Sequence, residues 1–71
     1  MKDFDYSMID LTMIDNCKMV SNLYYEECDK LLTEVLMDKP NVANVYNKLV
    51  NASKNHLYFD NFEDLKNYLE D

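Results

Sequence analysis

A chain of 71 residues forms one domain with a marginal hydrophobic core, because a chain of this size buries only about 60% of the surface that its unfolded form exposes. Fourteen acidic residues against seven lysines and no arginine argue against direct binding of DNA, RNA or anionic membranes, which depends on clustered positive charge. Apolar residues make up 48% of the chain and glycine is absent, which favours a folded helical protein over a disordered tail or a protein rich in β-hairpins.

The N-terminal segment shows no clear periodicity. Residues 4–11, FDYSMIDL, fit a helical turn, a strand or part of an irregular N-terminal arm over 1–11. The opening of the chain carries acids where a signal peptide carries basic residues, and no unbroken apolar run follows. We therefore expect a cytoplasmic protein in which residues 1–71 form a single domain.

A long helical pattern follows this segment. Apolar residues recur at intervals of three and four from Met13 to Leu36, which predicts one long amphipathic helix over about 13–38. We expect this helix to end near Asp38 because Pro40 cannot continue it. Its apolar residues fill an arc of about 160° on a helical wheel. The arc consists of Met13, Ile14, Cys17, Val20, Tyr24, Tyr25, Cys28, Leu31, Leu32, Val35 and Leu36.

Two shorter helices are predicted after the long one. Pro40 suits the first turn of a helix over about 41–54, which has a face of valines and leucine. Asp60 and Glu63 have the spacing of a capping box, which predicts a third helix over about 61–70. The sequence therefore predicts an all-α fold, a small three-helix domain in which one long helix packs against two short ones.

The stretch SNLYYEECDKLL, residues 21–32, is dense in reactive side chains. Tyr24, Tyr25 and Cys28 fall on the apolar arc of the long helix, so we interpret the stretch as a core face that alternates with a solvated face. The alternative is a tyrosine pair that stacks on a ligand ring or base. The first interpretation is favoured because the arc runs unbroken through these positions.

The two cysteines lie eleven residues apart on the predicted long helix. Their Cα atoms would be about 16 Å apart there, and a disulfide requires about 7 Å or less. We therefore expect Cys17 and Cys28 to be reduced core thiols that cannot bind one metal ion together. Because the sequence also lacks the spacings typical of zinc and di-iron sites, we expect no metal site.

No catalytic motif stands out in the sequence. His56 is the only histidine, it lies on a short apolar connector, and no nucleophile motif surrounds it. Glu26 and Glu27 would point about 100° apart on a helix, so they cannot face one substrate as general acid and base. Without glycine a glycine-rich phosphate loop is impossible. We expect no enzyme, no catalytic residues and no cofactor.

Acidic side chains form the candidate binding surfaces. Three of them fall within about 40° of one another on the second half of the long helix and form an acidic stripe: Glu27, Glu34 and Asp38. A second group opens the last helix, where carboxylates also suit the helix dipole: Asp60, Glu63 and Asp64. Solvation alone explains such surfaces, and contact with a basic partner is the alternative.

Two uncharged surfaces are further candidates. An apolar seam on the side of the long helix away from the core consists of Met19, Leu23 and Met37, and methionine-rich surfaces suit partner binding. The N-terminal segment would cover this seam in the alternative interpretation. A row of amides on the second predicted helix consists of Asn41, Asn44, Asn47, Asn51 and Asn55. This row would hydrogen-bond a partner or simply face solvent.

Three functions of different classes fit these features. The first is a small acidic protein-binding inhibitor, of the kind that phages and viruses with AT-rich genomes encode, which mimics nucleic acid and blocks a basic nucleic-acid-binding surface of a host or cellular protein. The second is a small oligomeric helical adaptor or assembly protein that works through the apolar seam. The third and weakest is a sponge or sensor for a small nucleotide, which the negative charge disfavours.

The inhibitor is the favoured function. A net charge of −7 exceeds what helix capping requires and costs stability through self-repulsion. We also expect a homo-oligomer, because two short helices would have to cover a wide apolar arc in a chain with a marginal core.

Overall fold

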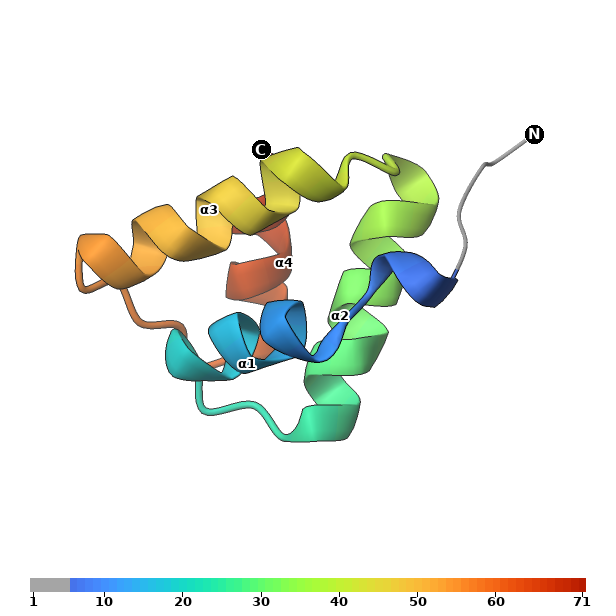
Figure 1. The fold of residues 1–71 in the computed structure, drawn as a ribbon. Coiled ribbons are helices and arrows are strands. Elements are labelled where there is room, and N and C mark those ends of the chain that lie inside the picture. The colour runs from blue at the N-terminus through green and yellow to red at the C-terminus, as the bar shows by residue number, and fades with distance from the viewer. Residues whose placement is uncertain (1–5) are drawn as a thin grey trace.

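The computed structural model describes residues 6–71, and in this range the chain folds into four α-helices and one 3-10 turn, with no strand (Figure 1). The elements are η1 (Tyr6–Met8), α1 (Leu11–Met19), α2 (Tyr25–Asp38), α3 (Val42–Lys54) and α4 (Phe62–Glu70). The predicted all-α class is confirmed. Of the N-terminal arm considered over 1–11, residues 1–5 lie outside the described residues, and the remainder forms η1 and the entry into α1.

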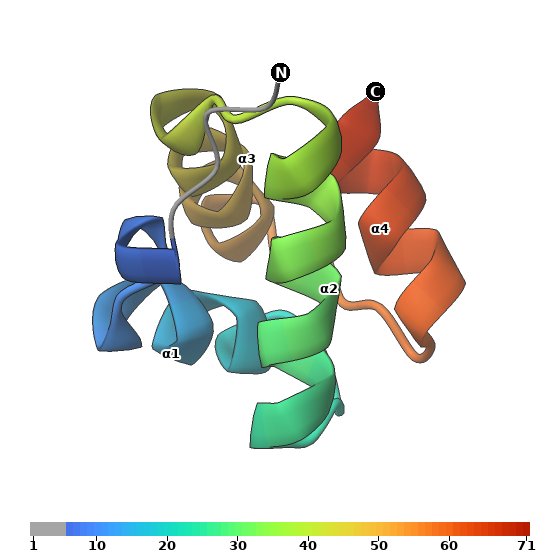
Figure 2. The same cartoon turned by 90° about the vertical axis from the view of Figure 1, so that its right-hand side faces the viewer.

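The prediction of one long helix over 13–38 is wrong. The chain leaves the helical conformation after Met19 and resumes it at Tyr25. Residues 20–24 form a connector between α1 and α2, and α1 lies across α2 instead of extending it (Figures 1 and 2). The described part of the chain therefore has four helices where three were expected.

Hydrogen bonds of the connector explain this break. The Ser21 hydroxyl donates to the Cys17 carbonyl at 2.8 Å and accepts from the Leu23 N–H at 3.4 Å. A hydroxyl that bonds nearby backbone groups offers the chain an alternative to the helical ladder. The Phe59 N–H, which lies between α3 and α4, donates to the Val20 carbonyl at 2.8 Å. This bond occupies the Val20 carbonyl, which would accept a backbone N–H of the next turn if the helix continued.

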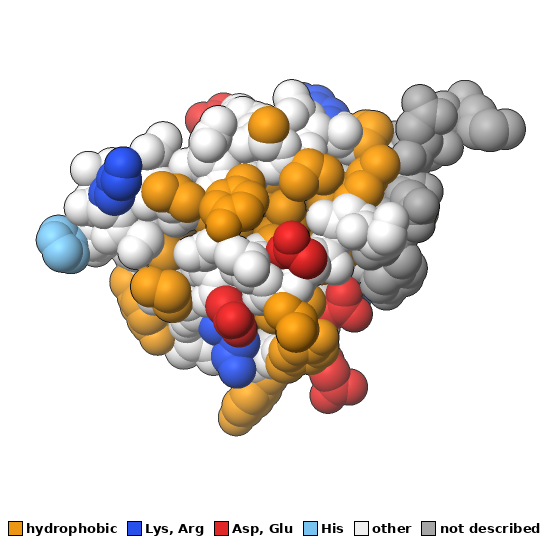
Figure 3. Space-filling view, viewed as in Figure 1, with side chains coloured by type: hydrophobic (Ala, Val, Ile, Leu, Met, Phe, Trp, Pro, Cys, Tyr) orange, Lys and Arg blue, Asp and Glu red, His pale blue; other side chains and the backbone are white. Residues whose placement is uncertain are grey.

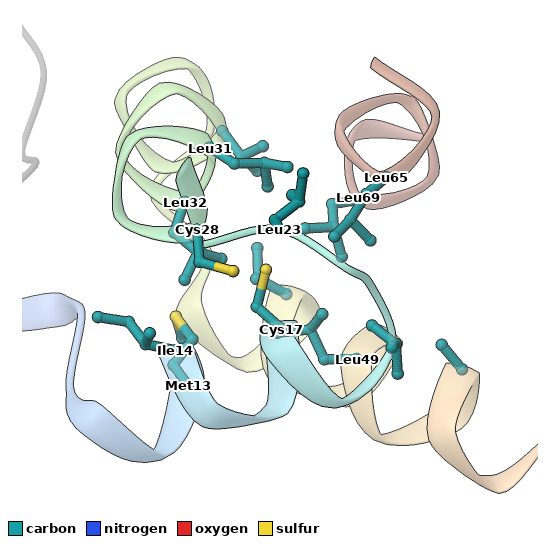
Figure 4. Close-up of a cluster of buried hydrophobic side chains, with 14 of the residues drawn as sticks. Met13, Ile14, Cys17, Leu23, Cys28, Leu31, Leu32, Leu49, Leu65 and Leu69 are labelled. Atoms are coloured by element: carbon teal, nitrogen blue, oxygen red, sulfur yellow. The ribbon is translucent and has the colours of Figure 1, made fainter. Parts of the chain in front are cut away.

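The four helices enclose one hydrophobic core (Figure 4). Helices α1 and α4 each pack against both α2 and α3. All four contribute to the core, whose buried apolar residues are Met13, Ile14, Cys17, Val20, Leu23, Cys28, Leu31, Leu32, Val35, Leu36, Val45, Leu49, Ala52, Leu65 and Leu69. Folding α1 back onto α2 and α3 thus allows a short chain to cover its own apolar surface.

The break moves two expected core residues to the surface. Tyr24 is 78% exposed and Tyr25 is 48% exposed, whereas the other residues of the predicted arc are buried. Tyr24 stands before the first turn of α2, where its backbone N–H donates to the Glu27 carboxylate at 2.9 Å. The interpretation of the two tyrosines as core residues was therefore wrong, because it assumed a helix that continues through residue 24.

The N-terminus of α4 is capped one residue later than predicted. Asn61, not Asp60, accepts from the backbone N–H of the third helical residue, Asp64, at 2.8 Å. The Asn61 amide also donates to the Asp64 carboxylate at 3.1 Å. Asparagine and aspartate cap equally well, so the predicted pair of Asp60 and Glu63 was an equivalent local choice. The same kind of cap starts α1 and α3.

Candidate functional site

An open groove of about 710 Å³ lies along α4 and the α3–α4 connector, residues 55–61. Its lining residues are Tyr58, Phe59, Asp64, Asn67, Tyr68, Glu70 and Asp71. Six of these seven are either acidic or aromatic, so the walls combine negative charge with ring faces. We call this feature the acidic groove. Of these residues the sequence predicts only Asp64 as a binding residue, since the position of the connector beside α4 is set by folding.

The end of α3 sets the course of the connector. His56 has a φ of 58°, in the left-handed region where glycine is usual. The His56 N–H donates to the Ser53 carbonyl at 3.2 Å, and the Leu57 N–H donates to the Ala52 carbonyl at 2.8 Å. Together these bonds form a Schellman motif, which ends a helix and redirects the chain. The single histidine thus has a structural role at the end of α3.

Phe59 anchors the connector beside the groove. Its N–H donates to the Val20 carbonyl at 2.8 Å, and its ring packs on the Tyr68 ring with the centroids 5.2 Å apart. Phe59 is half-buried, whereas the adjacent Tyr58 is 58% exposed. One aromatic residue therefore fixes the groove wall while its neighbour presents a ring to solvent.

A lysine of α3 holds the C-terminal end of α4. The Lys48 ammonium donates to the Tyr68 carbonyl at 3.0 Å and to the Asp71 carbonyl, and it lies 5.6 Å from the centre of the Tyr68 ring. The Tyr68 hydroxyl donates in return to the Lys48 carbonyl at 3.2 Å. A cation at a helix C-terminus is favourable because the helix dipole is negative there. Lys48 therefore stabilises the end of α4 that forms one wall of the groove.

The predicted acidic stripe lies entirely on α2, at Glu27, Glu34 and Asp38. Its first residue, Glu27, has a structural role as the acceptor of the Tyr24 N–H. Glu34 lies 3.9 Å from the Lys66 ammonium of α4, which in turn lies 3.5 Å from Glu70 of the acidic groove. Lys66 thus connects the stripe of α2 with the groove of α4.

The predicted acidic cluster at the start of α4 is exposed, at Asp60, Glu63 and Asp64. Glu63 and Asp64 lie in the first turn of the helix, where their carboxylates face the positive end of the helix dipole. Of the three, only Asp64 lines the groove. The cluster therefore combines a structural role with a contribution to the negative surface.

The predicted apolar seam is not a continuous surface. Leu23 is only 7% exposed and belongs to the core, while Met19 is 65% exposed on α1 and Met37 is exposed on α2. The interpretation was wrong because it assumed one helix through residues 20–24. On the face shown in Figure 3, over α1 and α3, apolar side chains appear among scattered acidic and basic ones.

The row of asparagines lies on and beside α3, at Asn41, Asn44, Asn47, Asn51 and Asn55. Two of its members flank the helix: Asn41 is the N-cap and accepts from the Asn44 N–H at 3.1 Å, and Asn55 is the C-cap. All five are exposed. Capping thus explains the two ends of the row without a partner.

The break between α1 and α2 brings the two cysteines together. Cys17 and Cys28 are fully buried free thiols, and their sulfur atoms are directed toward one another (Figure 4). The predicted separation was wrong because it assumed a continuous helix. The contact with Cys28, together with burial, raises the pKa of Cys17. The contact with Cys17, aided by Ser21 and opposed by burial, lowers the pKa of Cys28.

No group of three or more His, Cys, Asp or Glu side chains in residues 6–71 is arranged to hold a metal ion. None of the helices in the same range has the length and apolar character needed to cross a membrane. Comparison of the chain with protein-family models, curated proteins and solved structures found no match in any of the three.

Proposed function

We propose that this chain is a small acidic inhibitor that occupies the basic nucleic-acid-binding surface of another protein as a nucleic-acid mimic. The observation that carries the proposal is the acidic groove, whose shallow, open surface is lined by Asp64, Glu70 and Asp71 together with Tyr58 and Tyr68. The net charge of −7 supports it, because a strongly negative protein attracts a basic partner at long range.

Arginine is the partner side chain that this groove suits best. The planar guanidinium pairs with carboxylates through two parallel hydrogen bonds and stacks on aromatic rings. Lysine gains an ion pair and a cation–π contact but lacks the planar fork. A small anionic nucleotide is disfavoured, because the three carboxylates of the groove repel its phosphates. The groove therefore favours the inhibitor over the nucleotide sponge.

The acidic stripe of α2 extends the proposed binding surface. Lys66 lies within 4 Å of both Glu34 and Glu70, at 3.9 and 3.5 Å. The side chains of Lys66, Glu34 and Glu70 are 23%, 40% and 28% exposed, so solvent screens these ion pairs only in part. An arginine of the partner that displaces Lys66 would bind as a second basic side chain beside the one in the groove.

The helical adaptor is a second candidate, favoured by exposed apolar side chains outside the groove. Leu11, Met19 and Tyr24 are the most exposed of these. Self-association stays a prediction, but its original reason no longer holds, because the chain covers its own apolar arc. Leu11, Met19 and Tyr24 are the candidate contacts between copies.

Two variants with equal loss of charge test the inhibitor proposal. The groove variant removes three carboxylates by Asp64→Asn, Glu70→Gln and Asp71→Asn. The control variant removes three carboxylates that do not line the groove by Asp15→Asn, Glu26→Gln and Asp29→Asn. Both keep side-chain size, and circular dichroism checks that both keep the helical signal. The binding target is a nucleic-acid-binding protein recovered from a lysate with the tagged chain.

We expect the groove variant to lose at least tenfold in affinity, about 1.4 kcal/mol, and the control to lose much less. The target's nucleic acid should compete for the same surface, and added salt should weaken binding. Equal losses in the two variants would show that net charge, not the groove, determines binding. Unchanged affinity in both variants, with no effect of salt, would contradict nucleic-acid mimicry.

A further inference from the structure

Two free thiols meet in the core between α1 and α2. Cys17 and Cys28 are fully buried, and Figure 4 shows their sulfur atoms directed toward one another from the two helices. Each thiol perturbs the pKa of the other. Figure 4 also shows apolar side chains beside the pair, among them Ile14 and Leu32. The binding surface proposed above leaves this pair without a role.

We propose that Cys17 and Cys28 form a buried oxidation site, at which a peroxide converts the two thiols into a disulfide that joins α1 to α2. The inference stands independently of the proposed inhibitor function. It depends on the fold of the α1–α2 connector, because the same two residues would be far apart on a continuous helix.

The chemistry is a two-step oxidation in which hydrogen peroxide is the oxidant. The Cys28 thiolate attacks one peroxide oxygen, the O–O bond breaks, and the hydroxide that leaves takes up the proton lost by Cys28 to become water. Cys28 is then a sulfenic acid. The Cys17 sulfur attacks the Cys28 sulfur, the S–O bond breaks, and hydroxide leaves with the Cys17 proton as a second water. Two thiols and one peroxide thus give one disulfide and two waters.

The surroundings of the two thiols favour Cys28 as the first to react. The thiolate is the attacking species, and the Cys17 and Ser21 side chains lower the pKa of Cys28. The pKa of Cys17 is raised by Cys28 and by burial.

The fold provides both access and a measurable consequence. Hydrogen peroxide is small enough to enter during local opening of α1 or its connector. The sulfur atoms of a disulfide are about 2.05 Å apart, closer than two thiols that are not bonded, so oxidation draws the two helices together. A cross-link over such a short loop restricts the unfolded chain, which should raise the thermal midpoint by about 10 °C.

The test treats the reduced, folded chain with hydrogen peroxide and then alkylates the remaining thiols in denaturant, where buried thiols react. Intact mass should show a monomer that has lost two hydrogen atoms and takes up no alkyl group. Its thermal midpoint should rise by about 10 °C, and a dithiol reductant should reverse both changes. Retention of two free thiols, addition of oxygen without a cross-link, or cross-linked dimers would overturn the proposal.

Single-cysteine variants test whether both thiols are needed. Cys17→Ala and Cys28→Ala each leave one thiol that has no partner in the same chain. Neither variant should lose two hydrogen atoms or show the rise in midpoint. A rise in either variant would overturn the disulfide as its cause. If the alanine variants do not fold, the measurement on the unaltered chain still decides whether the disulfide forms.

Discussion

Two of the three connectors between the α-helices lie in opposite environments, and neither contains glycine. The α1–α2 connector, residues 20–24, buries three of its five residues, whereas the α3–α4 connector, residues 55–61, leaves six of its seven exposed. The two are joined by the 2.8 Å hydrogen bond from the Phe59 N–H to the Val20 carbonyl. The buried connector thus belongs to the core, and the exposed one shapes the surface from which the acidic groove is built.

This contrast separates the two candidate roles of the chain. The buried connector places the two thiols in contact, so changes there should affect stability and thiol chemistry together. The exposed connector directs Tyr58 toward solvent and Phe59 onto α4, so side-chain changes there should affect binding more than stability.

The largest expected effect is a difference in the free energy of unfolding between two alanine variants, each of which replaces a leucine in one connector. Leu23 is buried and Leu57 is exposed, so replacement of each by alanine deletes the same atoms in opposite environments. We expect Leu23→Ala to lower the free energy of unfolding by roughly 2–3 kcal/mol, because it leaves a cavity. Leu57→Ala should cost less than about 0.5 kcal/mol. Urea denaturation measures both, and equal losses would contradict the difference in burial.

A smaller effect is expected from the buried hydroxyl of the first connector. Ser21→Ala removes the hydrogen bond to the Cys17 carbonyl and leaves the Leu23 N–H without its hydroxyl acceptor. The free energy of unfolding should fall by about 1–2 kcal/mol, since a buried donor loses its partner. Ser53→Ala in α3 is the matched control and should be neutral or slightly stabilising, because alanine is the better helix former. A neutral Ser21→Ala would mean that this hydroxyl does not hold the connector.

The sequence predicts the parts of the fold that local signals determine. Helices α3 and α4 end at the predicted residue and begin one residue later than predicted, because Pro40 and the apolar periodicity are local features. The break before α2 has only a weak local signal, the adjacent Ser21 and Asn22. Of the two bonds of the Ser21 hydroxyl, the one to the Cys17 carbonyl also occurs within helices, whereas the one from the Leu23 N–H replaces a helical bond. The Phe59 N–H that completes the break comes from a distant part of the chain.

The sequence predicts the negative charge of the candidate site but not the shape of its surface. Acidity near α4 is visible in the sequence, and Asp64 was selected from it. The groove also needs Tyr58 and Phe59 beside α4, and that course depends on a left-handed residue at His56. Since glycine is the usual signal for such a turn, a histidine there gives no local indication. The contact between the cysteines was missed for the same reason as the break, because it exists only once α1 folds onto α2.

The smallest expected effect concerns His56, the left-handed residue that ends α3. At a φ of 58° a side chain with a Cβ is strained by roughly 1–2 kcal/mol, and glycine removes this strain but loses more chain entropy on folding. His56→Gly should therefore raise the free energy of unfolding by about 0.5 kcal/mol, while His56→Ala should lower it by a similar amount. Chemical denaturation of the three proteins should give the order glycine, histidine, alanine from most to least stable.

Because neither change alters a carboxylate or a ring of the acidic groove, both variants should bind a basic target as the parent does. An alanine variant as stable as the glycine variant would contradict the left-handed conformation, and with it the turn that brings Tyr58 and Phe59 to α4.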